Sequence, residues 1–153
     1  TGDTWEDGSG DARGYSVNLP YYPYTADALW LEGFEAVVPP VVQAFAPDVL
    51  VAQLGADTRF SDPLAHLQVR MATFPRLWTV LHDMADEVTD GRWIALGGGG
   101  YNVDVLPRAW ALLFAEMTGT DLPDEIPRDW LALAAERSDR DDLTEMLLGA
   151  EDL

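Results

Sequence analysis

A chain of 153 residues, 48% of them hydrophobic, is long enough to form one domain with a buried core. Its 27 acidic residues outnumber the 9 basic ones, and the net charge of -18 argues against nucleic acid or an anionic membrane as a partner, because both would be repelled. The chain has no cysteine, which excludes disulfides, thiol catalysis and cysteine zinc sites, and no apolar run of membrane-spanning length, so we expect a cytoplasmic protein.

The amino-terminal third of the chain predicts one short strand and one helix. Glycines and acidic residues over residues 1–14 indicate a loop, and residues 15–19 fit a short strand that Pro20 ends. Asp27 is a suitable cap for a helix whose apolar residues continue to position 45. Pro39 and the proline after it should kink or interrupt that helix, because an interior proline removes a backbone hydrogen bond.

Strand, helix, strand, helix is the order predicted for the following segment. The continuous apolar run at residues 49–54 is typical of a buried parallel strand. After a loop, residues 74–88 carry apolar side chains at helical spacing. Residues 92–96 then predict a second strand, and residues 103–117 a helix that tolerates a proline in its first turns. This order implies an α/β fold in which helices flank a parallel sheet.

Two loops follow the carboxyl ends of these strands. Gly55 begins the first loop, and the second reads Gly-Gly-Gly-Gly-Tyr-Asn at residues 97–102. Glycines leave the second loop without Cβ atoms, so backbone and ligand can approach closely. In parallel sheets the functional crevice lies beyond the carboxyl ends of the strands. We therefore expect Asp57 and Tyr101 at the same edge of the sheet, provided that the two strands are neighbours.

Asp57 is the first candidate for chemistry. Its carboxylate can bind a metal, act as a base or cap the next turn, and capping is the commonest role for an aspartate after a strand. Asp62, directly before a proline, is expected to form a turn or to support another residue. We expect His66 to be structural and His82 to be solvated, and neither has a second histidine at ligand spacing. A zinc site made by this chain alone is therefore not expected.

The glycine loop differs from the dinucleotide-binding fingerprint. That pattern requires glycine at positions 97, 99 and 102, whereas position 102 is asparagine. No acidic residue ends a following strand at the distance that a ribose contact needs, about 20 residues further on. Phosphate binding at the start of the next helix stays open on weak grounds.

Several motifs, taken in order along the chain, resemble one family. They are Leu-Gly-Ala-Asp-Thr at residues 54–58, Asp-Pro-Leu at 62–64 and Gly-Gly-Gly-Gly-Tyr-Asn at 97–102, with Tyr-Ser-Val-Asn-Leu-Pro at 15–20 before them. Arg108 and Trp110 also lie where the family's next helix carries that pair. Over about residues 1–120, this ordered set is similar to the zinc-dependent deacetylases related to histone deacetylases, particularly their bacterial acetoin-utilization branch.

The resemblance implies a role for each matching residue. Asp57 would be the third ligand of a zinc ion that an Asp and a His also bind. Tyr101 would donate a hydrogen bond to the acetyl carbonyl as it becomes an oxyanion. Gly99 and Gly100 would wall the narrow acyl-lysine channel, where any side chain would block passage, and Leu64 would supply part of its apolar lining.

Tyr15 lies where the family offers a backbone carbonyl to a monovalent cation. The resemblance also implies an arginase/deacetylase-like three-layer fold, with residues 1–120 as the carboxyl-terminal portion of the catalytic domain and 121–153 as an acidic helical tail. The family's Asp-x-His ligands and its general acid/base histidine pair precede the matching segment. We therefore expect the chain alone to bind zinc poorly and to be inactive without the amino-terminal half of the domain.

An acetyl-lysine protein, hydrolysed to lysine and acetate, is the substrate that the resemblance implies. An acetylpolyamine-type amidohydrolase, acting on another acetylated amine, shares the same metal machinery, and the charge of -18 slightly favours such cationic substrates. A non-catalytic binding or interaction module that keeps these loops for ligand capture is the alternative from another class.

Overall fold

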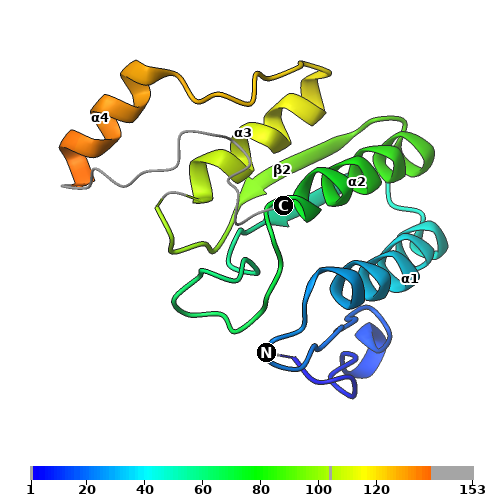
Figure 1. The fold of residues 1–153 in the computed structure, drawn as a ribbon. Helices are drawn as coiled ribbons and strands as arrows, with labels where there is room; N and C mark the ends of the chain where they lie inside the picture. Colours follow the sequence, from blue (N-terminus) through cyan, green and yellow to red (C-terminus); the bar gives the residue numbers. More distant parts are fainter. Residues whose placement is uncertain (1, 104, 139–153) are drawn as a thin grey trace.

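The computed structural model describes residues 2–103 and 105–138 (Figure 1). In chain order, its elements are the 3-10 turn η1 (Gly10–Ala12), α1 (Asp27–Phe45), β1 (Leu50–Leu54), α2 (Thr73–Thr89), β2 (Trp93–Gly97), α3 (Val105–Thr118) and α4 (Arg128–Ser138). The expected acidic helical tail is described as far as residue 138, where α4 ends. None of the described helices combines the length and the apolar character needed to cross a bilayer.

The two strands form a parallel sheet. β1 pairs with β2 in a register that joins Leu50 to Trp93 and Leu54 to Gly97. Parallel neighbours cannot be joined by a tight turn, and α2 lies in the connection between them (Figure 1). The prediction of an α/β chain with a parallel sheet and flanking helices is confirmed.

The hydrophobic core lies between one face of the sheet and helices α1, α2 and α3. Ala52 and Leu54 of β1 belong to this core, together with Trp78 of α2, which is only 1% exposed. Trp30 from α1 and Leu113 from α3 complete the same cluster across the three helices. Burial of large apolar side chains of this kind is the main favourable term in folding.

The opposite face of the sheet is exposed within the described residues. Val51 of β1 and Ile94 and Leu96 of β2 are 58%, 50% and 48% exposed. They alternate with the core-facing positions, as the two-residue period of a strand requires. We call Val51, Ile94 and Leu96 the open sheet face. Such a face is unusual, because parallel sheets are normally covered on both sides.

Helix α1 runs from Asp27 to Phe45 without a break at Pro39 and Pro40. Two interior prolines remove two backbone donors, which is why the sequence predicts a kink or an interruption there. The helix continues because its inward side, which includes the buried Trp30, packs into the core. Tertiary packing of this kind supplies most helical stability in proteins, and here it outweighs the missing hydrogen bonds. The expected interruption is absent.

Asp27 does not cap α1, contrary to the expectation from sequence. The N-cap position is Ala26, which makes no side-chain hydrogen bond. The Asp27 carboxylate instead accepts hydrogen bonds from the backbone N–H of Arg70 and from the hydroxyl of Thr73, each at 2.6 Å. Because Thr73 begins α2, this carboxylate joins the starts of two helices rather than closing the end of one.

Residues 15–19 do not form the expected strand. A strand needs a neighbour for its backbone hydrogen bonds, and this segment has no ladder partner within the described residues. The side chain of Asn18 instead donates to the backbone carbonyls of Asp3 and Glu6, at 3.0 and 3.1 Å. The segment is thereby held as a loop against the start of the chain.

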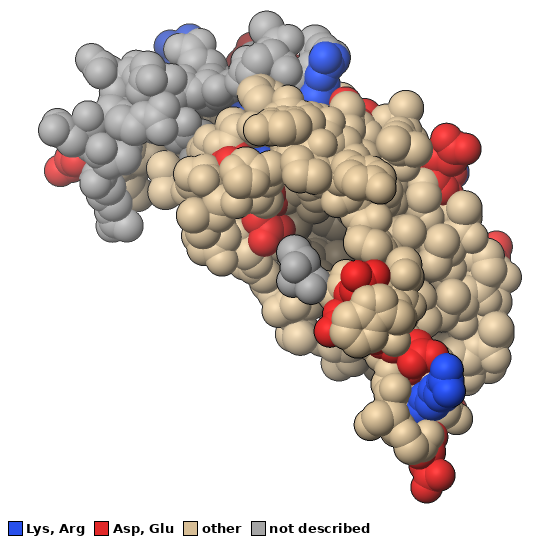
Figure 2. Space-filling model, turned by 90° about the horizontal axis from the view of Figure 1, so that it is seen from below, with Lys and Arg blue, Asp and Glu red and all other residues tan. Residues whose placement is uncertain are grey.

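Carboxylates outnumber basic groups on the surface, as the net charge requires. Figure 2 shows them at several places on one face, with few basic side chains between them. On α2, Asp83, Asp86 and Glu87 are all exposed, while its opposite side enters the core. The amphipathic pattern predicted for this helix is therefore confirmed.

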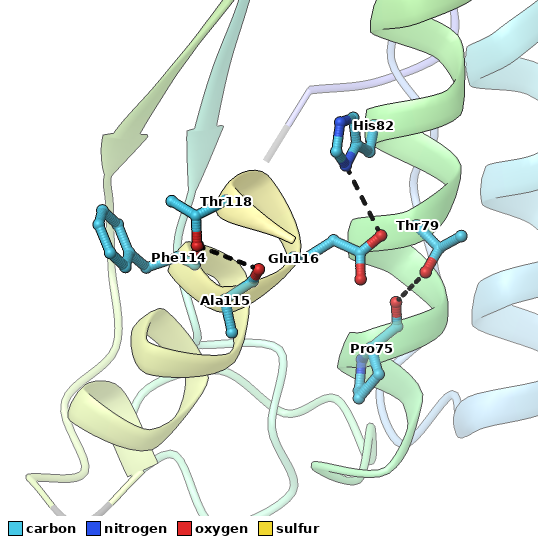
Figure 3. A network of polar contacts seen from close by, with 7 residues as sticks. All are labelled: Pro75, Thr79, His82, Phe114, Ala115, Glu116 and Thr118. Atoms are coloured by element: carbon cyan, nitrogen blue, oxygen red, sulfur yellow. Dashed lines mark hydrogen bonds and ion pairs between the residues drawn. The ribbon is translucent and has the colours of Figure 1, made fainter. Parts of the chain in front are cut away.

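Helices α2 and α3 lie beside each other, and an ion-pair contact joins them (Figure 3). His82 Nδ1 lies 3.7 Å from a carboxylate oxygen of Glu116, with the two side chains 30% and 32% exposed. The His82 ring also packs against Trp93 of β2, with 6.0 Å between ring centroids. His82, expected to be solvated, is thus only partly exposed, because α3 and β2 cover part of that side of α2.

Candidate functional site

The loops that follow β1 and β2 lie against each other at the carboxyl end of the sheet. We call residues 55–64 and 97–102 the loop pair. The backbone N–H of Ala56 donates to the carbonyl oxygen of Gly99 at 2.8 Å, which links the two loops directly. A Cβ added to Gly98 would lie 2.7 Å from a backbone nitrogen of the first loop. This close approach of two backbones requires glycine.

Asp57 lies in the first loop, with its carboxylate against the second. A Cβ built on Gly99 would lie 2.1 Å from Asp57 Oδ2, and one built on Gly55 would lie 3.0 Å from Asp57 Oδ1. Asp57 is half-buried, and its carboxylate has no hydrogen bond or ion pair with any other described residue. The capping interpretation is therefore wrong. Oxygens that the protein leaves unengaged are what a metal or a reacting group would need.

Tyr101 lies in the second loop and is 57% exposed. Its backbone N–H donates to Asp62 Oδ2 at 2.9 Å, which ties the tyrosine to the first loop. Its hydroxyl makes no hydrogen bond with the rest of the described chain, so the phenol is available to a molecule from outside. Asp57 and Tyr101 thus lie on adjoining loops, and neither is enclosed in a dry interior.

Asp62 is buried between the two loops, at 8% exposure. Its Oδ1 accepts the backbone N–H groups of Leu64 and Ala65 at 2.8 and 2.9 Å, which confirms the turn expected before a proline. Burial acts to raise the pKa of Asp62, but the three backbone N–H groups that it accepts outweigh burial, and the pKa is lowered. The carboxylate is therefore held in its charged form.

Ser61 and Asn102 also join the two loops, and sequence reasoning did not identify them. Asn102 Nδ2 donates to Ser61 Oγ at 2.9 Å, beside the contact between Asp62 and Tyr101. In the sequence, Asn102 breaks a glycine fingerprint and ends the Gly-Gly-Gly-Gly-Tyr-Asn motif, and neither pattern indicates a bond to Ser61. The available signal was residue type, because Ser and Asn side chains in loops readily bond to nearby chain.

Leu64, Gly99 and Gly100, which the resemblance places along a channel, all lie in or beside the loop pair. Leu64 is 63% exposed, as a lining residue would need to be. Gly100 has a φ of 131°, and an added Cβ would lie 2.8 Å from Leu106 Cδ1. Glycine is thus needed at this position for a local reason, and the channel role stays a prediction.

Tyr15 is not brought together with the loop pair. Its ring packs edge-on against Phe45, with 5.9 Å between centroids. Phe45 ends α1 and leads into the start of β1, whereas Asp57 follows the other end of that strand. A cation held by the Tyr15 carbonyl would therefore lie away from Asp57 and Tyr101, and this role stays a prediction.

A hollow of about 410 Å³ runs along β1, and all residues of that strand line it. Its walls are mostly apolar and include Phe34 of α1 and Leu81 of α2. Asp57, Gly98 and Gly99 line it beyond the end of the strand. The unengaged carboxylate of the loop pair thus borders a cavity as well as the exposed Tyr101 loop.

Asp57 alone does not make a zinc site. A catalytic zinc ion needs about three protein ligands and one open position. Across the part of the chain that the structure describes, no three His, Cys, Asp or Glu side chains form a group that could hold a metal ion. Asp57 supplies one oxygen donor of a suitable kind, and the described residues by themselves do not fit the metal.

The sequence matches known proteins over most of the chain. Residues 1–117 match the family model of the histone deacetylase domain. The chain is 41% identical over 132 residues to the acetoin utilization protein AcuC of Bacillus subtilis (strain 168), a match that covers 86% of this chain and 34% of that protein. It is 38% identical over 128 residues to AcuC of Staphylococcus xylosus, covering 82% and 33%.

The fold is also similar to that of solved histone deacetylase homologs. An HDAC homolog complexed with SAHA superposes with a TM-score of 0.81 at 27% identity, covering 97% of this chain and 41% of that one. An HDAC homolog from Aquifex aeolicus gives 0.77 at 30% identity, covering 87% and 34%. The chain spans about a third of the length of the curated relatives that it matches. With an arginase/deacetylase-like α/β fold, it belongs to the histone deacetylase superfamily, in the acetoin-utilization branch.

Proposed function

We propose that this chain is part of a zinc-dependent protein lysine deacetylase, which hydrolyses the amide of acetyl-lysine to lysine and acetate in the cytoplasm. The observation that carries the proposal is that Asp57 and Tyr101 lie on the two joined loops of the loop pair. Neither the Asp57 carboxylate nor the Tyr101 hydroxyl has a hydrogen-bond partner in the described chain. Family membership supports an acetylated substrate.

Tyr101 acts on the acetyl group in this proposal. Its hydroxyl donates a hydrogen bond to the carbonyl oxygen as that oxygen gains negative charge. A donor already in position when the charge develops needs no reorganisation, which is why such groups contribute strongly to rate. The exposed ring and the tied backbone N–H of Tyr101 support this role, because the side chain reaches outward from a held main chain.

Asp57 provides one carboxylate ligand of the zinc ion. The other ligands lie outside the described residues. Gly99 and Gly100 leave room along the acyl-lysine channel, and Leu64 adds apolar surface to it. The exposure of Leu64 and the contact of Gly99 with the Asp57 carboxylate support these roles. The Tyr15 carbonyl would hold a monovalent cation away from this centre.

Residues 1–120 form the carboxyl-terminal portion of a larger catalytic domain in this proposal, and the amino-terminal portion is its partner. The open sheet face supports this, because a second layer would be needed to cover it. The hollow along β1 supports it too, since it is lined by Trp78, whose buried Nε1 has no hydrogen-bond partner among the described residues. Without that partner, residues 1–153 would lack most of the zinc ligands and would not deacetylate.

The Tyr101→Phe variant of the complete protein tests the deacetylase proposal. Acetate release from an acetyl-lysine peptide should fall about a hundredfold to a thousandfold, as when an oxyanion donor is removed. Zinc content should not change, because the hydroxyl is not a ligand. Tyr22→Phe is the matched control, since Tyr22 is 87% exposed and lies outside the loop pair. Undiminished turnover of Tyr101→Phe would overturn the proposal.

Purified residues 1–153 test the part of the proposal that concerns the partner. The isolated chain should bind zinc poorly and should release no acetate from the same peptide. Activity of the isolated chain would refute the need for the amino-terminal portion and would leave the deacetylase assignment intact.

A further inference from the structure

The loop that carries Tyr101 has little stiffness of its own. Four successive glycines precede the tyrosine, and glycine has more conformational freedom to lose on folding than any other residue. A hydrogen-bond donor stabilises a developing charge only if it is held in place beforehand. Some other part of the chain must therefore fix the Tyr101 backbone.

Asp62 makes that connection. It comes from the other loop, 39 residues away in sequence, and its Oδ2 accepts the Tyr101 backbone N–H at 2.9 Å. Its Oδ1 closes its own turn through Leu64 and Ala65. Each carboxylate oxygen thus has a separate task, and the carboxylate is buried at 8% exposure, where unmade hydrogen bonds are costly.

A second link stands beside the first. Asn102, the residue after Tyr101, donates from Nδ2 to Ser61 Oγ at 2.9 Å, and Ser61 precedes Asp62. Two successive residues of the glycine loop are therefore joined to two successive residues of the Asp57 loop. We call the Asp62–Tyr101 and Ser61–Asn102 contacts the latch.

We propose that Asp62 is a positioning residue for deacetylation, which holds Tyr101 at a fixed place relative to Asp57 through the latch and does not touch the substrate. The inference rests on the proposed function, because it concerns the reaction in which Tyr101 takes part. A residue that only formed the turn would need Oδ1 alone. The turn does not require the hydrogen bond between Asp62 Oδ2 and the Tyr101 backbone.

The Asp62→Asn variant of the complete protein separates the two tasks. An amide has one carbonyl oxygen and one NH2 group. The carbonyl oxygen should stay with the two N–H donors of the turn, which leaves the NH2 group facing the Tyr101 N–H. The turn is then kept and the link to Tyr101 is lost. Asp83→Asn, on the exposed side of α2, is the matched control and should behave as wild type.

With acetyl-lysine peptide as substrate, kcat of Asp62→Asn should fall about a hundredfold, the loss typical of a misplaced catalytic group. KM and zinc content should stay close to wild type, because substrate and metal contacts are not removed. In a Tyr101→Phe background the same substitution should cause little further loss, because residues that act as a unit are not additive.

Wild type, Asp62→Asn, Tyr101→Phe and the double variant also give the results that would overturn the inference. If Asp62→Asn lowers kcat by the same factor in the wild-type and Tyr101→Phe backgrounds, or does not lower kcat at all, Asp62 does not position Tyr101. The proposed function would still hold in that case, provided that Tyr101→Phe itself is defective. Full activity of Tyr101→Phe would overturn both. If Asp62→Asn does not fold, Asn102→Ala removes the second half of the latch without touching the turn. Asn102→Ala should also lower kcat in the otherwise wild-type protein and should cause little further loss in the Tyr101→Phe background. An equal loss of kcat in both backgrounds would overturn the inference.

Discussion

The helices behind the sheet and the loop pair at its carboxyl end are held in place by different interactions. In the helix layer, Phe74 and Trp78 are each 1% exposed, and their rings pack with 5.5 Å between centroids. In the loop pair, backbones meet at glycine and are joined by polar contacts such as that of Asp62 with Tyr101. Burial orders the first region, whereas hydrogen bonds and the absence of side chains shape the second.

This difference separates stability from chemistry. Removing a large side chain from the core leaves a cavity and lowers the free energy of unfolding, whatever the protein does. Adding a single carbon to the loop pair displaces few atoms, but those atoms include the groups proposed to act. Variants of the helix layer should therefore lose stability first, and variants of the loop pair should lose turnover first.

Trp78→Ala should give the largest effect on the stability side of this comparison. Replacing a buried tryptophan by alanine typically lowers the free energy of unfolding by about 3–5 kcal/mol. Urea unfolding of the complete protein measures the change. Trp5→Ala is the matched control, because Trp5 is 73% exposed and should have little effect. Equal losses for the two variants would show that the described core does not stabilise the complete protein.

Gly99→Ala should give the largest effect on the chemical side after loss of Tyr101 itself. The new Cβ would lie 2.1 Å from Asp57 Oδ2, so the carboxylate must turn away. A misplacement of about 1 Å can cost about a hundredfold in rate, and we expect a loss of that order in acetate release together with weaker zinc retention.

Gly98→Ala sharpens this result. Its Cβ would meet the backbone of Gly55, at 2.7 Å from the nitrogen, rather than the flexible end of a side chain. Gly98→Ala should therefore also lower the unfolding temperature, whereas Gly99→Ala should leave it nearly unchanged. A drop in stability for Gly99→Ala with normal activity would reverse the assignment of the loop pair to chemistry.

The regular elements of the fold could be predicted because their signals are local. Helix α2, predicted over residues 74–88, spans Thr73–Thr89. The prediction succeeds because the spacing of the apolar residues indicates which side of the helix enters the core. The position of Asp57 and Tyr101 at the same edge of the sheet could be predicted because each residue follows the carboxyl end of a parallel strand. The strand expected at residues 15–19 failed because a strand depends on a neighbour, and nothing within those five residues reveals whether one is present.

The contacts that shape the site could not be predicted in the same way. Asp27 has the composition of a cap, but its partners lie 43 and 46 residues away. Asn102 meets Ser61 across 41 residues. Such pairs become visible only when two loops are placed side by side. The family motifs identified Asp57 and Tyr101 as candidates. Asp62 and Asn102 lie within such motifs too, but nothing in the motifs indicates that these residues join the two loops.

Acid should weaken the loop pair through Asp62. Burial opposes its charged form, but the backbone N–H groups that it accepts outweigh burial and lower its pKa in the folded protein. A lowered folded pKa adds stability above the unfolded value, and this stability is lost as the pH falls through the folded value. The difference in unfolding free energy between wild type and Asp62→Asn should therefore be constant near neutral pH and shrink below about pH 4. Urea unfolding across this range measures it, and a difference that does not shrink in acid contradicts the assignment.

The contact of His82 with Glu116 should have the smallest effect, because both side chains keep about a third of their exposure. Exposed pairs of this kind typically contribute about 0.2–1 kcal/mol, and this one is an ion pair only while the imidazole carries a proton. Glu116→Gln should therefore lower the free energy of unfolding, measured by urea, by less than about 1 kcal/mol. Glu87→Gln, on the exposed side of α2, is the control. A loss of several kcal/mol would mean that polar contacts, and not burial alone, hold the helix layer together.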